Sequence, residues 1–371
     1  MKYKNVTRFT HQQKDRVGVL ITNLGTPQAP TAKALRPYLK QFLSDPRVVE
    51  IPRLLWWLIL NCIILRIRPA RSAEAYKTVW TDEGSPLATI THAQQKAINT
   101  ELKARLSKNT SGLNSDDLLV EWAMRYGQPS IPNALQNMFE QGVRKLVVLP
   151  LYPQYSASTS ASTFDAIAED FTRRRWIPEL RFSNGYHDDP RYTKAVADSI
   201  REHWKNNKRA DKLVMSFHGV PQRYLHNGDP YHCQCLASAR LIAEELGLTK
   251  DDYIVSFQSL FGRAEWLRPY TDETLKSLPG KGVKSVEVVC PGFSADCLET
   301  IEEIDKENRE YFMENGGQEF HYIPALNDSP AHINALCDIL EEQMAHWTVQ
   351  NESTLRNKNF TECPYNHKSE K

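Results

Sequence analysis

A histidine at the end of an apolar run is the residue of this sequence best suited to proton or metal chemistry. His218 follows the run 212–217 and precedes Gly219, so its imidazole should emerge at the edge of a sheet. An imidazole in that position can accept a proton near neutral pH or bind a divalent metal ion. A lone histidine more often has a structural role, but a strand end that faces other polar strand ends favours chemistry.

A row of carboxylates in the segment 293–307 is the second group. Asp296 suits the N-cap of a helix, where an acidic side chain interacts favourably with the helix dipole. Glu299, Glu303 and Glu307 are spaced by four, which places them on one helical face. Like charges on one face repel unless solvent or a cation neutralises them. The row is therefore either a solvated helix face or a path that leads a hydrated metal ion toward the histidine.

The cysteines and the missing nucleotide motifs restrict the other kinds of site. Cys233 and Cys235, with Cys290 and Cys297, are conceivable ligands of an iron–sulfur cluster, but their spacing matches none of the common ferredoxin patterns. Ordinary reduced thiols are the alternative, because seven cysteines are an odd number and too few for a disulfide scaffold of this length. No G-x-G-x-x-G, Walker or H-E-x-x-H motif occurs, which argues against nucleotide binding and a zinc hydrolase.

Short β-branched runs separated by helical patterns must position these residues. The predicted strands form two sets: 17–23, 118–124, 145–151 and 180–184, then 212–217, 253–258, 285–290 and 320–325. Such alternation predicts βαβ units and two parallel sheets with helices around them. Ligands of open parallel sheets bind beyond the carboxyl ends of the strands, where His218 and the segment 291–299 fall. We therefore predict a cleft between two similar α/β lobes.

The length of 371 residues also favours two domains. We expect a polar tail at 1–16, a first lobe at 17–188 with a pocket lip at 48–72, a second lobe at 189–328, a C-terminal helix at 329–347 that packs back on the first lobe, and a polar tail at 348–371. The net charge of +1, with no polybasic run, argues against a nucleic-acid partner. The polar start of the chain does not resemble a secretory signal.

The apolar segment 54–65, LLWWLILNCIIL, stands apart from this alternation. It is too short to span a bilayer, which needs about 20 residues. One interpretation is a buried helix. The other is a partly exposed lip that rests on a membrane or receives a flat apolar ligand. Two adjacent tryptophans, followed by Arg66, Arg68 and Arg71, favour the lip, since an apolar wall beside cations suits an amphiphilic acid.

Long motifs in a fixed order connect the chain to a known family. They are GSPL at 84–87, MRYG at 124–127, LPLYPQYS at 149–156, SFHGVPQRY at 216–224, GDPY at 228–231, the block from SFQS to DETL at 256–275, and PGFSADCLETIEEI at 291–304. With these motifs the sequence resembles the ferrochelatases from about residue 18 to residue 340, most closely those of Gram-negative bacteria. The resemblance implies two Rossmann-like lobes of the chelatase-like type, each with a four-stranded parallel sheet. It implies an enzyme, a lyase of haem biosynthesis that inserts Fe²⁺ into protoporphyrin IX.

The resemblance also implies roles for residues. His218 matches the family's active-site histidine and Glu299 the glutamate that faces it across the metal. The implied iron path comprises Asp296, Cys297, Glu303 and Glu307. The implied porphyrin-binding residues are Leu24, Arg68, Tyr76, Ser85, Arg125, Tyr126, Trp266 and Phe293. Fe²⁺ and protoporphyrin IX are then substrates, and no organic cofactor is expected.

Some features of the chain depart from the family or leave choices open. Relatives with a 2Fe–2S cluster carry a cysteine just after YPQYS and a cysteine-rich tail. Here Ala157 stands at that position and the tail has only Cys363, so such a cluster is not expected. We expect a cytoplasmic protein with peripheral membrane contact through 54–65. The alternatives are a non-catalytic haem or porphyrin carrier and a chelatase for another metal or tetrapyrrole. The sequence leaves open whether His218 is base or iron ligand, the choice between protoporphyrin and coproporphyrin, and the oligomeric state.

Overall fold

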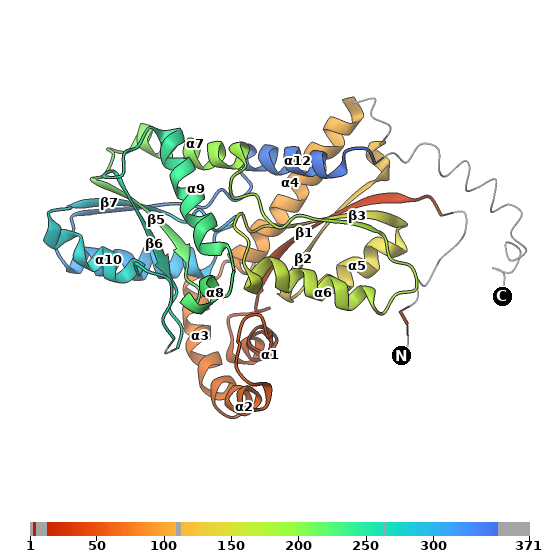
Figure 1. The fold of residues 1–371 in the computed structure, drawn as a ribbon, viewed down its shortest axis with the longest axis horizontal. Coiled ribbons are helices and arrows are strands. Elements are labelled where there is room, and N and C mark those ends of the chain that lie inside the picture. The colour runs from red at the N-terminus through yellow and green to blue at the C-terminus, as the bar shows by residue number, and fades with distance from the viewer. Residues whose placement is uncertain (1–2, 5–12, 109–112, 263, 348–371) are drawn as a thin grey trace, which may run out of the picture.

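Two four-stranded sheets, one per lobe, form the framework of the protein. The computed structural model describes residues 3–4, 13–108, 113–262 and 264–347, so the predicted tail at 348–371, Cys363 and most of the tail at 1–16 lie outside it. The sheet orders are β2-β1-β3-β4 and β6-β5-β7-β8, and all neighbouring strands are parallel. The predicted two-lobed α/β fold is confirmed (Figure 1).

The strands agree with the predicted runs to within three residues at either end. They are β1 Arg16–Thr26, β2 Leu118–Gly127, β3 Val143–Pro150, β4 Glu179–Phe182, β5 Lys212–His218, β6 Tyr253–Gln258, β7 Ser285–Val289 and β8 Glu319–Ile323. Helices cover both faces of each sheet, so central strands such as β1 are buried along most of their length. Strands buried on both faces need apolar residues at every position, which is why the sequence signal was continuous.

The helices pack around these sheets. The α-helices are α1 Ala32–Leu43, α2 Arg53–Ile59, α3 Leu65–Val79, α4 Pro86–Lys108, α5 Ile131–Glu140, α6 Ser162–Phe171, α7 Pro190–Asn206, α8 Gln222–His226, α9 Tyr231–Leu246, α10 Thr271–Ser277, α11 Arg309–Glu314 and α12 Pro330–Met344. Three π-helical segments are η1 Leu60–Ile64, η3 Ala157–Ala161 and η5 Glu299–Asn308. Two short 3₁₀ turns are η2 Ser115–Asp117 and η4 Pro279–Lys281.

The C-terminal helix α12 contacts both lobes. It lies against α4 and β3 of the first sheet's lobe and against α7 beside the second sheet (Figure 1). Arg105 of α4 pairs with Asp338 and Glu341 of α12, and Arg191 of α7 pairs with Glu342. α12 therefore ties the two lobes together on the side of the molecule away from α1 to α3.

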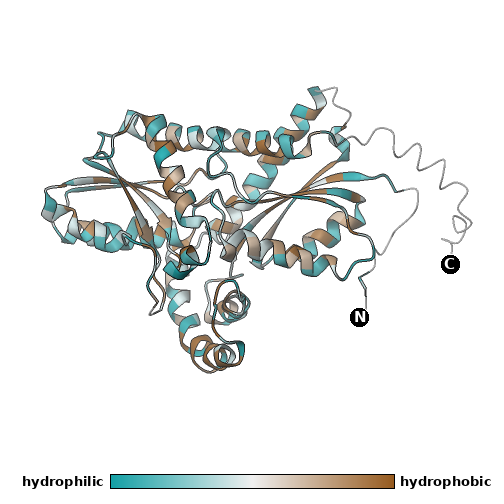
Figure 2. Cartoon of the chain, in the orientation of Figure 1, coloured by the Kyte–Doolittle hydropathy of each residue, from teal (hydrophilic) through white to brown (hydrophobic). Residues whose placement is uncertain are grey.

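The helices α1, α2 and α3 project from the body as a separate arm (Figure 1). The predicted lip segment 54–65 forms its tip, where apolar residues gather (Figure 2). Trp56 is buried and its Nε1 donates to the carbonyl of Leu43 at 2.6 Å, whereas Trp57 is 60% exposed and Leu54 is 86% exposed. The segment thus has one packed face and one open apolar face. Among the described residues, no helix is both long and apolar enough to cross a membrane.

Candidate active site

A cavity of about 570 Å³ opens at the carboxyl ends of the strands, where the two lobes and the arm meet. It is lined by Leu24, Tyr38, Phe42 and Arg68 from the first lobe and its arm, and by His218, Trp266, Glu299, Glu303 and Glu307 from the second. A smaller cavity of about 100 Å³ adjoins it, and both cavities share His218 and Glu299 in their walls. The volume of the larger one lies in the range of small-molecule sites.

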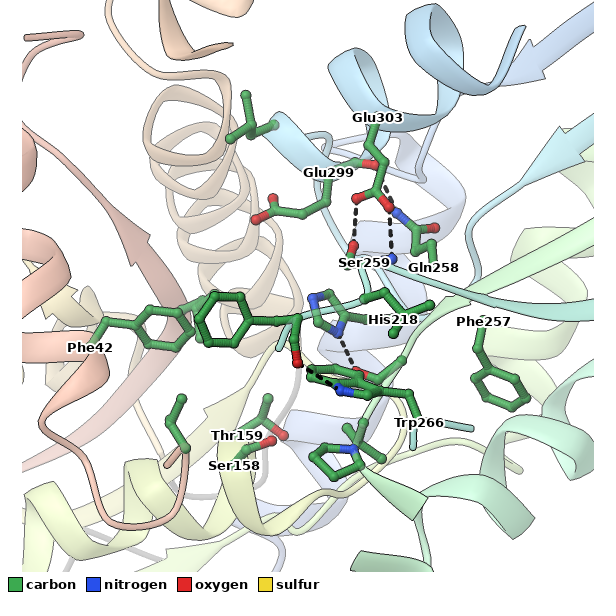
Figure 3. Close-up of a pocket in the computed structure, with 18 of the residues that line it drawn as sticks. Phe42, Ser158, Thr159, His218, Phe257, Gln258, Ser259, Trp266, Glu299 and Glu303 are labelled. Atoms are coloured by element: carbon green, nitrogen blue, oxygen red, sulfur yellow. Dashed lines mark hydrogen bonds between the residues drawn. The ribbon is translucent and has the colours of Figure 1, made fainter. Parts of the chain in front are cut away.

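His218 is the last residue of β5 and enters this cavity (Figure 3). Its Nδ1 lies 2.6 Å from the carbonyl oxygen of Gly219. Because a carbonyl can only accept, Nδ1 carries a hydrogen and donates it, so in the neutral imidazole Nε2 is the nitrogen with the lone pair. That second nitrogen faces the side of the cavity where Glu299 lies (Figure 3). The hydroxyl of Tyr231 donates to the backbone oxygen of His218 at 2.9 Å and fixes the strand end.

Glu299 begins the π-helix η5, a register that the sequence pattern did not reveal. The helix expected from the spacing of the glutamates is present, but its first part has i→i+5 hydrogen bonds before it becomes α11. Side chains contribute to this register: Gln258 donates to the backbone oxygen of Glu299 at 2.8 Å, and Asn308 to that of Glu303 at 2.8 Å. Short π-helical segments of this kind often occur at functional sites.

Glu303 is held by two donors from a single residue. Its Oε1 accepts from the backbone N–H of Ser259 at 2.7 Å, and its Oε2 accepts from the Ser259 hydroxyl. Burial raises the pKa of Glu303 to about 7, the negative charges of Glu299 and Glu307 add to the rise, and the bonds from Ser259 oppose it. Near neutral pH this carboxyl therefore changes easily between its protonated and charged forms.

The acidic row continues outward along η5. Glu307 accepts from the hydroxyl of Tyr311 at 2.5 Å, and this bond raises the pKa of Tyr311 to about 12. Glu302, which the spacing of four did not single out, also lines the cavity, and burial raises the pKa of its carboxyl. Residues Glu299, Glu302, Glu303 and Glu307 thus form a continuous acidic wall. This acidic wall would attract a cation.

Asp296 was expected on the iron path, but it lines neither cavity. Its carboxylate is buried and accepts from Thr300 at 3.0 Å, from Asn327 at 2.8 Å, from the hydroxyl of Tyr322 at 2.5 Å and from the backbone of Ala325 at 3.3 Å. Neutral donors therefore surround both oxygens. The geometry favours a structural role at the start of η5 over contact with a moving cation.

The six cysteines that the structure describes are free thiols. Cys297 is buried and lines the smaller cavity, and burial raises the pKa of its thiol well above the usual value. Cys233 is exposed and Cys235 is buried on opposite sides of α9. Within the described ranges, no group of three or more His, Cys, Asp or Glu side chains is arranged to hold a metal ion.

Four of the expected porphyrin-binding residues line a cavity. Leu24, Arg68 and Trp266 lie in the wall of the larger cavity, and Leu24 and Phe293 in that of the smaller one. The guanidinium of Arg68 stacks over the ring of Phe261 at 4.3 Å. Its Nη1 is buried and has no hydrogen-bond partner among the residues that the structure describes. A buried cationic donor without a partner is suited to an acidic ligand.

The other four expected porphyrin-binding residues lie behind the cavity wall. Ser85 accepts from Thr26 at 2.7 Å, and Tyr76 is buried. Arg125 is bound to Asp45 at 2.6 Å. Tyr126 is fully buried, and its hydroxyl donates to Asp45 at 2.8 Å. These four residues line neither of the two cavities, and their contact with the macrocycle stays a prediction.

For Tyr126 the physical reason is that a ring of α1 lies between β2 and the cavity. Phe42 lines the cavity and packs edge-on against Tyr126, with 5.0 Å between ring centroids. Tyr38 also lines it. These two residues were not predicted, because they lie on a helix face and not at a strand end. Ser158 and Thr159, which also line the cavity, follow the YPQYS motif after Ala157 and could have been found from it.

The arrangement of two parallel sheets with a cavity between them is the two-lobed fold of the chelatase type. The structure described as "SirB from Bacillus subtilis with Fe3+" matches with a TM-score of 0.52 over 89% of this chain and 96% of that chain, at 14% identity. The sirohydrochlorin chelatase SirB from Bacillus subtilis subspecies spizizenii, in complex with cobalt, matches with a TM-score of 0.50 over 88% and 95%, at 13% identity. At such identities the likeness shows the fold alone.

The sequence then gives the family. The Ferrochelatase family matches residues 16–344. The ferrochelatase of Idiomarina loihiensis is 61% identical over 356 residues, which cover 96% of each chain. That of Teredinibacter turnerae is 59% identical over 370 residues, which cover 99% of each chain. This chain belongs to the ferrochelatase family, and the resemblance inferred from its motifs is confirmed.

Proposed function

We propose that this protein inserts Fe²⁺ into protoporphyrin IX and that two protons leave the ring as the metal enters. The observation that carries the proposal is His218, whose Nε2 faces the side of Glu299 in a cavity between the two lobes while Nδ1 is bound to the carbonyl of Gly219. The sequence similarity of the whole chain to named ferrochelatases supports the same reaction. The acidic wall along η5 and the unpartnered Arg68 nitrogen are the features that a metal ion and an acidic macrocycle need.

The macrocycle fits the larger cavity by shape and charge. Aromatic and aliphatic side chains such as Phe42, Trp266 and Leu24 form walls on which a flat apolar ring can rest. Arg68 stands ready to donate to a propionate, and an ionised acceptor makes such a bond stronger than one between neutral groups. Walls that hold the ring bent, with its nitrogen lone pairs turned toward the metal, would favour the transition state over the flat free porphyrin.

His218 and Glu299 divide the chemistry between them. A free-base porphyrin carries two pyrrole N–H groups, and His218 Nε2 is the acceptor for a proton from them, because Nδ1–H is already committed to Gly219. Glu299 receives the iron at the inner end of the acidic row. Glu303 and Glu307 precede it on the same wall, where they attract the hydrated cation.

Measurement of metal insertion tests this function. The purified protein is incubated anaerobically with protoporphyrin IX and Fe²⁺, and the absorbance of the metalloporphyrin is followed. We expect turnover with Fe²⁺, and a parallel assay with coproporphyrin measures which of the two porphyrins the protein prefers. Porphyrin binding without insertion of any divalent metal would refute the proposal in favour of a carrier. Faster insertion of cobalt or nickel than of iron would favour a chelatase for another metal.

We further propose that the arm contacts the cytoplasmic face of a membrane. The exposed residues Leu54, Leu55, Trp57 and Leu58 lie together on α2. Such a cluster at the tip of a projection suits insertion to a shallow depth in a lipid surface. This arrangement would place the mouth of the cavity near the phase in which an apolar porphyrin accumulates.

A further inference from the structure

The end of β6 contains a backbone conformation that requires an explanation. Ser259 has φ +67°, in the left-handed region that residues other than glycine rarely adopt. The conformation directs both its N–H and its hydroxyl at the carboxylate of Glu303. Figure 3 shows this pair of bonds above His218, on the side of the cavity where Glu299 lies. Ser259 is thus fixed by a member of the acidic row.

The turn that follows Ser259 carries part of the cavity wall. Leu260, Phe261 and Trp266 line the cavity, and the indole N–H of Trp266 donates to the backbone oxygen of Phe261 at 2.9 Å. The ring of Phe261 lies under the guanidinium of Arg68, which comes from α3 of the arm. The direction of the chain at Ser259 therefore determines the positions of the Phe261 and Trp266 rings and of the contact between Phe261 and Arg68.

We propose that Glu303 and Ser259 are a positioning pair, in which the metal-side carboxylate holds the aromatic wall formed by Phe261 and Trp266 in the shape that binds the macrocycle. The pair deepens the proposed function, on which it rests. Glu303 then has two separable properties. Its negative charge attracts the cation, and its two hydrogen bonds fix Ser259.

Substitution can separate these properties. In Glu303→Gln the amide oxygen can still accept from the Ser259 N–H, and the amide nitrogen can donate to the Ser259 oxygen, so the bonds persist while the charge is lost. Glu303→Ala removes both charge and bonds. Ser259→Ala keeps the charge and removes the hydroxyl donor. Glu307→Ala is the matched control, because Glu307 belongs to the same row but is bound by Tyr311 and not by Ser259.

The experiment measures the dissociation constant of protoporphyrin IX without metal, by fluorescence titration, and the KM for Fe²⁺ in the insertion assay. We expect Glu303→Ala and Ser259→Ala to weaken porphyrin binding, by roughly two- to tenfold for each hydrogen bond lost. We expect Glu303→Gln to bind porphyrin as the wild type does and to need more Fe²⁺. Glu307→Ala should leave porphyrin binding unchanged. Circular dichroism tests whether each variant is folded. If Glu303→Ala does not fold, the porphyrin affinity of Ser259→Ala alone tests the pair.

Two outcomes would overturn the pair. Wild-type porphyrin affinity in Ser259→Ala would show that the turn needs no such support. Weakening in Glu303→Gln as large as that in Glu303→Ala would show that charge, and not hydrogen bonding, is what matters. Failure of the proposed function gives a different result. If the wild-type protein binds porphyrin but inserts no metal, the dissociation constants of the variants still test whether Glu303 and Ser259 position the aromatic wall. A wild type that binds no porphyrin refutes both proposals.

Discussion

Replacement of Glu303 by Gln should change how the stability of the protein depends on pH. In the folded chain burial raises the pKa of Glu303 from an ordinary 4.5 to about 7. Between these values the folded protein keeps a proton that the unfolded chain has released. The contribution of Glu303 to the free energy of unfolding is therefore highest below pH 4.5, and it is lost as the pH rises through 7. Gln does not titrate, so the variant should escape this loss.

The size of the effect follows from the same two pKa values. Each pKa unit corresponds to about 1.4 kcal/mol, so a rise from 4.5 to about 7 amounts to about 3 kcal/mol of unfolding free energy. Glu303 is partly exposed, which makes this an upper figure. The Ser259 bonds persist in Glu303→Gln, so they do not contribute to the difference.

The assay is urea unfolding of wild type and Glu303→Gln in metal-free buffer at several pH values between 4.5 and 8. We expect the variant to gain stability over the wild type by about 3 kcal/mol or less across this range. The slope of free energy against urea should be the same for both, so that the comparison concerns stability alone. Two curves that stay parallel from pH 4.5 to 8 would refute the reasoning, because Glu303 would then have no raised pKa in the folded state.

Three further predictions concern residues around the cavity. Arg68→Met should weaken porphyrin binding by roughly tenfold or more, because a charged donor is lost, whereas Arg71→Met should not, because Arg71 is exposed and lies outside the cavity lining. Equal affinities of the two variants in a titration would count against the propionate contact. Tyr126→Phe should cost about 1 kcal/mol of stability in urea unfolding and leave porphyrin affinity unchanged, since its hydroxyl binds Asp45 and not the cavity; a large loss of affinity would place it in the wall after all. Trp57→Ser should reduce binding to liposomes in a flotation assay, while the exposed Phe164→Ser on α6 should not; equal flotation of both variants would argue against the arm as the contact.

The sheets could be predicted because their physical signal is local. Strands covered on both faces, such as β1 and β5, are apolar at nearly every position, and the carboxyl ends of parallel strands meet on one side. These two facts were enough to direct attention to His218. The spacing of four and the place of the segment 291–299 beyond a strand end also singled out Glu299, which begins η5.

The remaining features depend on contacts between distant segments, which no local pattern records. The π-helical register of η5 involves a bond from Gln258, and the hydrogen bonds that Asp296 accepts involve donors from 322–327. Tyr126 is at a strand end as expected, yet Phe42 of α1 covers it. A strand end predicts where a side chain starts, and only the packing of the neighbouring helix decides whether it reaches the ligand.

The rate of Fe²⁺ insertion by His218→Ala, measured beside its affinity for protoporphyrin IX, tests the central claim most directly. The imidazole lies at a strand end where packing does not require it, so the variant should fold and bind the macrocycle as the wild type does. Loss of the base should slow insertion by about 10²–10⁴-fold. A variant that binds porphyrin normally and retains more than about a tenth of the wild-type rate would contradict the account, because His218 could not then be the proton acceptor.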